Sequence, residues 1–370
     1  MVTRVKAAAV FCLALLLMSC TDSYNKQSDN KQFKQRFTAY KALFVIDGRI
    51  VDTGNDEVSH SEGQGYGMLF AAHANDRVAF DSIWQWTQTV LQRPDGLFSW
   101  RYTPCTTKDT ACVDDPNNAS DGDVLIAWAL LRAAKRWNTP SYEDEARRII
   151  QAIEEKLIVT RDGYTLLLPG ESGFDNGNGV SDTNGGNGVS LSSNEVGVQF
   201  NLSYWVFPAL SAFSDYSEYP SIWQELFASG ISLVQKARFS SHQLPSDWTR
   251  LYKGSFSTNN VIASEFGFNA VRIPLHLAWS DTFLASAERN DVLSPFAKWW
   301  SQDYVPATLS LDDEKPAEYA MTLGMRAVEQ AVNNIVNDTA PDWPDINRDV
   351  DYYSASLVLL SMLAVSDISG

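Results

Sequence analysis

Two short acidic segments contain the side chains best suited to acid–base chemistry. Residues 61–68 read Ser-Glu-Gly-Gln-Gly-Tyr-Gly-Met and place Glu62 among glycines and Tyr66, and residues 119–123 contain Asp121. Each segment leads into an apolar run of the kind that forms a helix. A carboxyl group beside glycine backbone and an aromatic ring loses part of its hydration, which raises its pKa toward the range useful for a general acid. Together the two segments could supply a pair of catalytic carboxylates.

Each segment also has a purely structural interpretation. Glu62 could be an acidic residue in the first turn of a helix, where it favours the helix dipole. Ser120 or Asp121 could be an N-cap, with Asp123 favouring the dipole in the next turn. Neither segment alone therefore establishes a catalytic site.

The elements that must position these carboxylates are predicted to be mostly helices. Apolar residues recur at three- and four-residue intervals in residues 80–91, 124–137, 146–158, 221–234, 319–335 and 354–365. Strand-like alternation is confined to short pieces, of which residues 164–168 and 250–256 are the clearest. With weaker candidates the chain reaches roughly eleven or twelve helices, and no repeat of a solenoid type is visible. The sequence predicts an all-α fold that is compatible with a closed ring of helical hairpins.

Composition limits the partners that the chain can have. The chain has 370 residues, of which 45% are hydrophobic, and a formal net charge of −16. Such a charge disfavours nucleic acid and acidic polysaccharides, because both require Lys and Arg to neutralise their anionic groups. A neutral or a cationic substrate remains open. The 12 Trp and 14 Tyr residues could stack on sugar rings or fill the core.

The first twenty residues have the features of an export signal. Arg4 and Lys6 precede an apolar stretch at residues 7–17 that is too short for a stable membrane anchor. The following residues, Leu-Met-Ser-Cys at positions 17–20, resemble a bacterial lipobox. This resemblance implies that Cys20 carries a lipid that anchors the protein to a membrane, with an ordinary secretory signal as the alternative. We expect a periplasmic or outer-membrane lipoprotein, or else a secreted protein, with a signal at residues 1–20, a polar tether at 21–35 and one domain at 36–370.

The remaining cysteines suggest a disulfide. Cys12 would be removed with the signal and Cys20 would be lipidated, so Cys105 and Cys112 are left in an oxidising compartment. We predict a small loop disulfide between them. Metal binding is the weaker alternative, because the histidines show no ligand spacing; they are His60, His73, His242 and His276.

A family resemblance joins the two acidic segments. Residues 119–137 resemble, position by position, the signature helix of family 8 glycoside hydrolases, and residues 61–68 resemble the segment that carries the acid in that family. Further matching segments follow in order at residues 166–170, 200–204, 246–248, 270–272 and 351–353. The chain is similar to the periplasmic endoglucanases associated with bacterial cellulose synthesis. The resemblance covers nearly the whole mature chain and implies an (α/α)6 barrel with an open cleft across one end.

The resemblance also implies roles for the two carboxylates. Glu62 corresponds to the general acid, and Asp121 corresponds to the second carboxylate, which holds the sugar before the scissile bond. The family inverts the anomeric centre, so a base must activate water on the face of the sugar opposite the acid. No metal or organic cofactor is implied.

The sequence departs from the family where the base is expected. In the cellulase and xylanase branch an Asp precedes Ala-x-x-Arg, whereas this chain has Asn269 there. A carboxylate from elsewhere could replace it, as in the branch that contains chitosanases; the candidates are Asp175, Asp182, Glu195 and Glu265. Alternatively, Asp121 positions the water with Asn269 as a helper. As a third possibility, the protein has lost hydrolysis and kept a glucan-binding cleft.

Several residues in the matched segments are predicted to contact substrate. The candidates for stacking on sugar rings are Tyr66, Trp100, Tyr204, Trp205, Trp248 and Tyr353. Asp247 and Asn269 are predicted to contact the sugar, Asp247 through a hydroxyl group rather than as the base. Arg272 could pair with a cleft carboxylate or satisfy buried carbonyl groups. Trp128 and Trp137 lie within an apolar helix and are expected in the core.

The combined expectation is a monomeric, lipid-anchored, inverting endo-β-1,4-glucanase that acts on a β-linked polysaccharide. The enzymatic alternative is a chitosanase or a mixed-linkage β-glucanase, which the missing Asp favours and with which the acidic surface is compatible. The non-enzymatic alternative is a glucan-binding surface protein on the same scaffold.

Overall fold

A computed structural model of the chain describes residues 28–105, 112–175, 197–259 and 262–369. The predicted signal, Cys20 and the base candidates Asp182 and Glu195 lie outside these ranges. Residues 28–44 form a helix, and Phe33 and Phe37 on it are buried in the core against Phe70. The folded part therefore includes residues from 28 to 35 that the sequence assigned to the polar tether, because their aromatic side chains have a core to enter.

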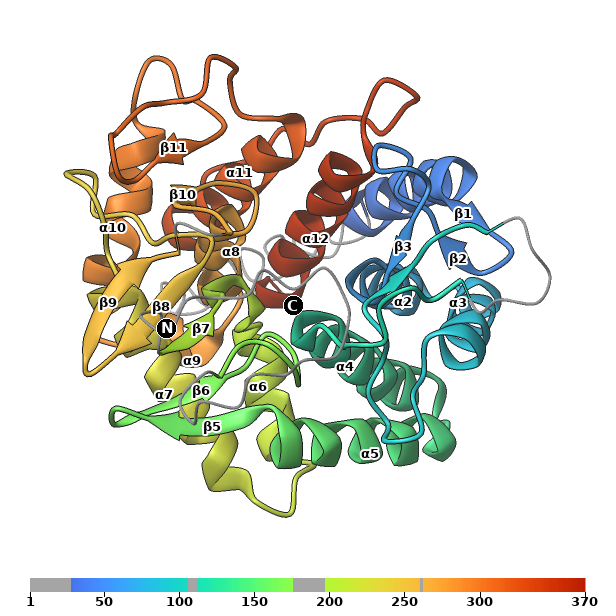
Figure 1. The fold of residues 1–370 in the computed structure, drawn as a ribbon. Coiled ribbons are helices and arrows are strands. Elements are labelled where there is room, and N and C mark those ends of the chain that lie inside the picture. Colours follow the sequence, from blue (N-terminus) through green and yellow to red (C-terminus); the bar gives the residue numbers. More distant parts are fainter. Residues whose placement is uncertain (1–27, 106–111, 176–196, 260–261, 370) are drawn as a thin grey trace, which may run out of the picture.

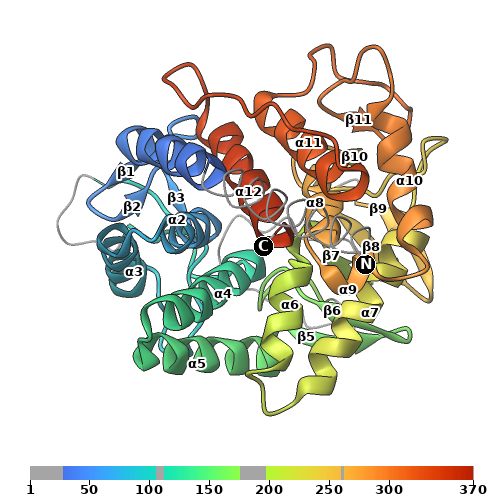
Figure 2. The same cartoon turned by 180° about the vertical axis from the view of Figure 1, so that it is seen from behind.

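The described helices form a ring with an inner and an outer layer (Figures 1 and 2). The inner helices are α2 (Ser61–Ala74), α4 (Ser120–Trp137), α6 (Phe207–Ser214), α8 (Ile273–Ala278) and α12 (Tyr352–Ile368). The outer helices are residues 28–44, α3 (Arg77–Val90), α5 (Pro140–Lys156), α7 (Pro220–Lys236) and α10 (Arg289–Trp300). Helix α11 (Leu323–Asn337) packs against α8 and α12, and the short α9 (Asp281–Leu284) follows α8. This arrangement confirms the predicted all-α barrel of helical hairpins.

The two layers explain which helices the sequence reveals. Outer helices such as α3 and α5 bury one face only, so their apolar residues repeat with the helical period. The ranges predicted for α3, α4, α5, α7, α11 and α12 agree with the structure to within six residues, although α4 and α12 belong to the inner layer, and the outer helix α10 was not predicted. Helix α8 is buried on all sides, from Ile273 through Ala278. A helix that is surrounded by protein has no polar face, so no amphipathic pattern identifies it.

Short antiparallel strands occur in the connections between helices. Strands β5 (Ile158–Arg161) and β6 (Tyr164–Leu167) form a hairpin, and β7 (Val198–Phe200), β8 (Thr249–Tyr252) and β9 (Ser255–Thr258) form a small sheet. The strand-like piece predicted at residues 250–256 is divided between β8 and β9, because Lys253 and Gly254 have left-handed backbone angles, with φ of 48° and 74°, and turn the chain between the two strands. Two-stranded pairs join β1 (Val45–Ile46) to β2 (Arg49–Ile50), β3 (Ser59–His60) to β4 (Arg101–Tyr102) and β10 (Glu265–Phe266) to β11 (Leu309–Ser310).

Cys105 and Cys112 form a disulfide, which confirms that prediction. In the described part of the chain, no helix is both long enough and apolar enough to span a bilayer.

Candidate active site

The N-termini of α2 and α4 touch, and this contact brings the two acidic segments together. A Cβ atom on Gly122 would lie 2.1 Å from the Ser61 Oγ atom and 2.8 Å from the Glu62 backbone nitrogen. A Cβ atom on Gly65 would lie 2.6 Å from the Leu125 Cβ atom. Only glycine fits at both positions, because any side chain would force the helices apart. Glu62 and Asp121 are therefore neighbours at the start of two adjacent inner helices.

Arg272 connects Glu62 with the opposite side of the site. Its side chain is 3% exposed, and its Nη1 atom forms an ion pair with Glu62, whose side chain is 23% exposed. The same nitrogen donates a hydrogen bond to the Tyr66 Oη atom at 2.9 Å, and Tyr66 in turn donates to the Glu62 Oε1 atom at 3.0 Å. The prediction that Arg272 pairs with a site carboxylate is confirmed, with Glu62 as the partner. Both donors stabilise the charged form of Glu62.

The second arm of the Arg272 guanidinium holds Asn269. Nη2 donates to the Asn269 Oδ1 atom at 2.9 Å and to the Ser203 Oγ atom at 3.0 Å. With its oxygen occupied, Asn269 directs its amide nitrogen to the Asp247 Oδ2 atom at 3.4 Å. Asn269 therefore links Arg272 to a second buried carboxyl group.

Asp247 fixes the turn that carries Asn269. Its Oδ1 atom accepts hydrogen bonds from the backbone nitrogens of Gly267 at 2.9 Å and Ala270 at 2.7 Å. A Cβ atom on Gly267 would lie 3.1 Å from the Asp247 Oδ2 atom and 3.2 Å from the Glu265 Oε1 atom. The carboxyl groups of Asp247 and Glu265 thus approach the same point beside Gly267.

Burial changes the protonation of the acidic groups in this region. It raises the pKa of Asp121 to about 7, against the opposing effect of the hydrogen bond from the Gly122 backbone nitrogen. Burial likewise raises the pKa of Asp123 to about 8 and that of Asp247 to about 6, although each accepts two or more hydrogen bonds. Carboxyl groups with such values can exchange protons near neutral pH.

Asp123 has a structural role beside this site. It accepts hydrogen bonds from the Phe98 backbone nitrogen at 2.9 Å and from the Asn118 side chain at 2.7 Å. These contacts attach the loops before α4 to its first turn. Asp123 therefore has a structural role, in which its partners are these loops. The N-cap interpretation of Ser120 and Asp121 is wrong, because Ala119 is the N-cap of α4 and makes no side-chain cap hydrogen bond.

The predicted stacking residues divide into two groups. Trp205 is completely buried and donates from its indole to the Leu226 carbonyl, so its prediction as a sugar platform is wrong. Tyr66 is 1% exposed and its ring stacks on Phe70, so it can act only through its hydroxyl group and the prediction of a stacking role is also wrong. Trp205 packs against α7, beside Leu226 and Gly230, whereas Tyr66 packs on Phe70 of its own helix.

The other predicted aromatic residues keep part of their surface exposed. These residues are Trp100, Tyr204, Trp248 and Tyr353. Trp248 stacks on Phe174 with a centroid distance of 5.7 Å and meets the edge of Tyr204 at 6.2 Å. Tyr353 donates to the Phe268 carbonyl, next to Asn269. The expectation for Trp128, which packs on Trp279 in the core, is confirmed, whereas Trp137 at the end of α4 is only partly buried.

The candidate bases lie in different places. Asp175 forms an ion pair with Arg161 at the end of β5, so its carboxylate already has a cationic partner. Glu265 lies in β10, two residues before Gly267. Its carboxyl group lies near that of Asp247, because both are close to the position of a Cβ atom on Gly267. Asp121 lies on the same side as the proposed acid. Of the described candidates, Glu265 is the one that lies beside the turn carrying Asn269, next to Asp247.

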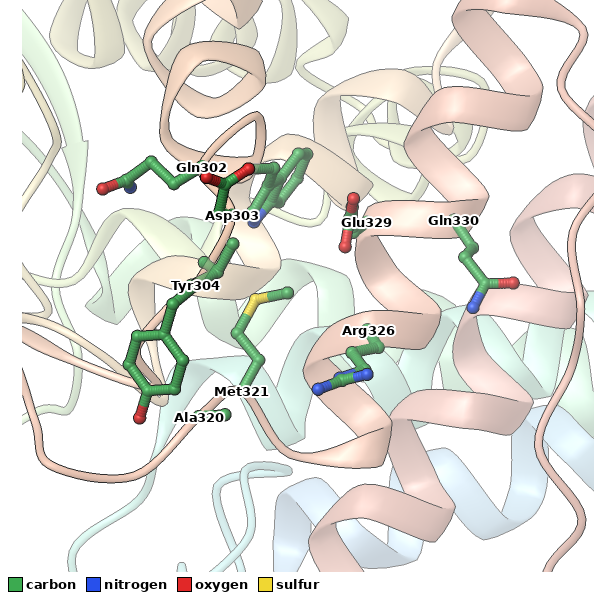
Figure 3. A pocket seen from close by; sticks show the side chains of 10 residues that line it. Gln302, Asp303, Tyr304, Ala320, Met321, Arg326, Glu329 and Gln330 are labelled. Atoms are coloured by element: carbon green, nitrogen blue, oxygen red, sulfur yellow. The ribbon is translucent and has the colours of Figure 1, made fainter.

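A separate pocket lies between the end of α10 and α11 (Figure 3). Its volume is about 370 Å³, and Tyr304, Arg326 and Glu329 are among the residues that line it. It shares no lining residue with the Arg272 network. In the described residues there is also no group of three or more side chains that could hold a metal ion.

Sequence reasoning missed three features of the site. It did not place Ser203 in contact with Arg272, although Ser203 lies in a matched segment. It did not foresee that Arg272 bridges Glu62 and Asn269, or that Asp247 and Glu265 approach each other at Gly267. The one available signal was Gly267, which lies between Glu265 and Asn269 in the sequence.

Comparisons with known proteins agree with this fold. The model of the family described as "Glycosyl hydrolases family 8" matches residues 5–367. A probable endoglucanase of Novacetimonas hansenii is 34% identical over 337 residues, which cover 89% of this chain and 90% of that protein. An endoglucanase of Cellulomonas uda is 36% identical over 296 residues, which cover 78% of this chain and 74% of that protein.

Solved structures give the same result. A family 8 endoglucanase from Klebsiella pneumoniae is 36% identical with a TM-score of 0.77, and the match covers 90% of this chain and 99% of that one. An endo-β-1,4-glucanase from Acetobacter xylinum is 34% identical with a TM-score of 0.78, and the match covers 91% of this chain and 98% of that one. The similarity therefore extends over the barrel as a whole.

Proposed function

Because the chain belongs to family 8 of the glycosyl hydrolases, we propose that it cleaves β-1,4-linked glucan chains internally and with inversion at the anomeric carbon. It is a glycoside hydrolase of the endo-1,4-β-glucanase type, as its relatives are. The observation that carries the proposal is the contact between the N-termini of α2 and α4, which places Glu62 beside Asp121. Two neighbouring carboxyl groups in distinct environments are what acid catalysis on a glycoside requires.

Glu62 is the general acid in this proposal. It gives its proton to the departing glycosidic oxygen as the bond from that oxygen to the anomeric carbon breaks. The resulting carboxylate is stabilised by the Arg272 guanidinium and by the Tyr66 hydroxyl group. The contacts of Glu62 therefore correspond to the state that follows proton donation, which is the state in which a carboxylate needs donors.

Asp121 anchors the sugar next to the scissile bond. Because burial raises its pKa to about 7, it can donate as well as accept a hydrogen bond to a sugar hydroxyl group near neutral pH. Trp100, Tyr204, Trp248 and Tyr353 keep exposed surface that can pack against further sugar rings. These roles require no metal and no organic cofactor.

A second candidate function is favoured by one observation. Asn269 stands where the cellulase branch has its base, and the branch that contains chitosanases and mixed-linkage glucanases has Asn there too. The net charge of −16 would attract a cationic polymer. A third candidate, glucan binding without hydrolysis, follows if no other carboxylate takes over the role of the base.

Release of reducing ends from carboxymethylcellulose, lichenan and chitosan separates these functions. We expect the highest rate on carboxymethylcellulose, a fall in viscosity that is faster than the release of reducing ends, and first products in the α configuration. The highest rate on chitosan or lichenan would establish the second candidate. Binding of all three polymers without release from any of them would exclude a hydrolase.

We further propose that the protein is an exported lipoprotein and a monomer. The proposal of a lipid anchor rests on residues 1–20 alone. In cells, the Cys20→Ser variant is expected to move from the membrane fraction to the soluble fraction, because the thiol that accepts the lipid is lost. Recovery of that variant in membranes at the wild-type level would contradict the anchor, and a dimer by light scattering would contradict the monomer.

A further inference from the structure

We propose that Glu265 is the catalytic base of this chain and that Asp247 and Asn269 position the turn beside it. This inference rests on the proposed function, because a base is needed only if the chain hydrolyses glycosides. It answers the question raised by Asn269, whose neutral amide cannot accept a proton from water. Three observations support the inference. The Glu265 carboxyl group lies close to Asp247 beside Gly267, the Glu265 side chain has no hydrogen bond or ion pair among the described residues, and both carboxyl oxygens of Asp247 are already hydrogen-bonded.

The place of Glu265 follows from the contacts around Gly267. The point where a Cβ atom of Gly267 would lie is 3.2 Å from the Glu265 Oε1 atom and 3.1 Å from the Asp247 Oδ2 atom. The negative charge of Glu265 is one of the effects that raise the pKa of Asp247, after burial, which is the largest. Glu265 therefore lies close to Asp247, and the absence of a side chain at position 267 makes this approach possible.

A continuous series of contacts runs from this point to the acid. Asp247 accepts from Asn269, Asn269 accepts from Arg272, and Arg272 pairs with Glu62. The Nη1 atom of Arg272 thus contacts Glu62, and its Nη2 atom contacts Asn269, which leads on to the carboxyl groups of Asp247 and Glu265. An inverting hydrolase needs its two carboxyl groups on opposite sides of the sugar, with space for a water molecule between them.

Glu265 is the carboxylate that is free to act. Its side chain is partly exposed, and among the described residues it makes no hydrogen bond or ion pair. Asp247 is 3% exposed and has both oxygens engaged, Oδ1 with two backbone nitrogens and Oδ2 with Asn269. Asp247 therefore holds the turn in place, whereas Glu265 can accept a proton from water.

The step itself is a single displacement. The oxygen of a water molecule forms a bond to the anomeric carbon while the bond from that carbon to the glycosidic oxygen breaks. Glu265 takes one proton from the water, and Glu62 gives its proton to the departing oxygen. One water molecule is consumed, and one new reducing end and one new hydroxyl group are produced.

Glu265→Gln tests the inference in the full-length protein. We expect kcat to fall by roughly 10²- to 10⁴-fold with KM little changed, and the acidic limb of the pH profile of kcat/KM to disappear. The Gln side chain matches Glu in shape, so the Tm should stay near that of the wild type. The matched control is Glu318→Gln, an exposed glutamate outside the network, which should keep the wild-type rate and pH profile.

A small anion distinguishes a base from a structural residue. Glu265→Ala should regain turnover with azide, which attacks the anomeric carbon without a base and gives an α-glycosyl azide detectable by mass spectrometry. The double variant Glu265→Gln with Asn269→Asp should regain part of the hydrolytic rate, because a carboxylate returns to the neighbouring position.

Two results would overturn the inference while leaving the proposed function intact. One is a Glu265→Gln variant with the wild-type kcat and acidic limb; the other is a folded, inactive Glu265→Ala variant that azide does not rescue. A wild-type protein that hydrolyses none of the polymers would instead refute the proposed function itself.

Discussion

Glu62→Gln is expected to lower kcat on cellulosic substrates by roughly 10²- to 10⁴-fold while the protein remains folded. The amide can still accept hydrogen bonds from Arg272 and Tyr66, so the local geometry is kept, but it has no proton to give. Arg272 loses its anionic partner, so we expect a Tm lower by a few degrees. Steady-state kinetics and thermal unfolding of the same preparation measure both effects.

The dependence on the leaving group shows whether Glu62 acts as an acid. A substrate whose leaving group is a dinitrophenolate needs little protonation, so Glu62→Gln should lose far less activity on an aryl cello-oligosaccharide of that type than on cellulose. The control is Glu318→Gln, which should resemble the wild type on both substrates. Equal losses on the two substrates would assign Glu62 a structural role, and a wild-type rate on cellulose would remove it from the mechanism.

Arg272→Lys is the second substitution with a large expected effect. Arg272 uses two separate nitrogens, one for Glu62 and Tyr66 and the other for Ser203 and Asn269. The single ammonium group of lysine keeps the charge but cannot reach both sides of the site. We expect kcat to fall about 10²-fold, because the acid and the turn at residue 269 lose their common support.

Kinetics and thermal unfolding of Arg272→Lys check this prediction. Buried groups left without donors should also lower the Tm. Arg148→Lys is the matched control, because the Arg148 side chain is 55% exposed and forms a surface ion pair with Glu145, three residues earlier on the same helix, so its replacement should be neutral. A wild-type kcat for Arg272→Lys would mean that charge alone, and not the two-armed geometry, is what the site requires.

The sequence by itself determined the helical architecture and the identity of the acidic segments. Outer helices such as α3 and α5 could be predicted because a helix with one buried face must repeat its apolar residues with the helical period. The segments around Glu62 and Asp121 could be found because their glycines and acidic residues follow one another in the chain. The disulfide could be predicted because Cys105 and Cys112 are the two cysteines that remain once Cys12 and Cys20 are assigned to the signal and the lipid.

Only the tertiary structure decided which of these residues work together. Tyr66 and Arg272 are separated by 206 residues, and their contact depends on how α2 packs against the turn before α8. The burial of Trp205 and Tyr66, the convergence of Asp247 and Glu265 at Gly267, and the choice of Glu62 as the partner of Arg272 follow from the same packing. Local patterns record how much of each helix is buried, but not which neighbour buries it, because many partners can cover the same apolar face.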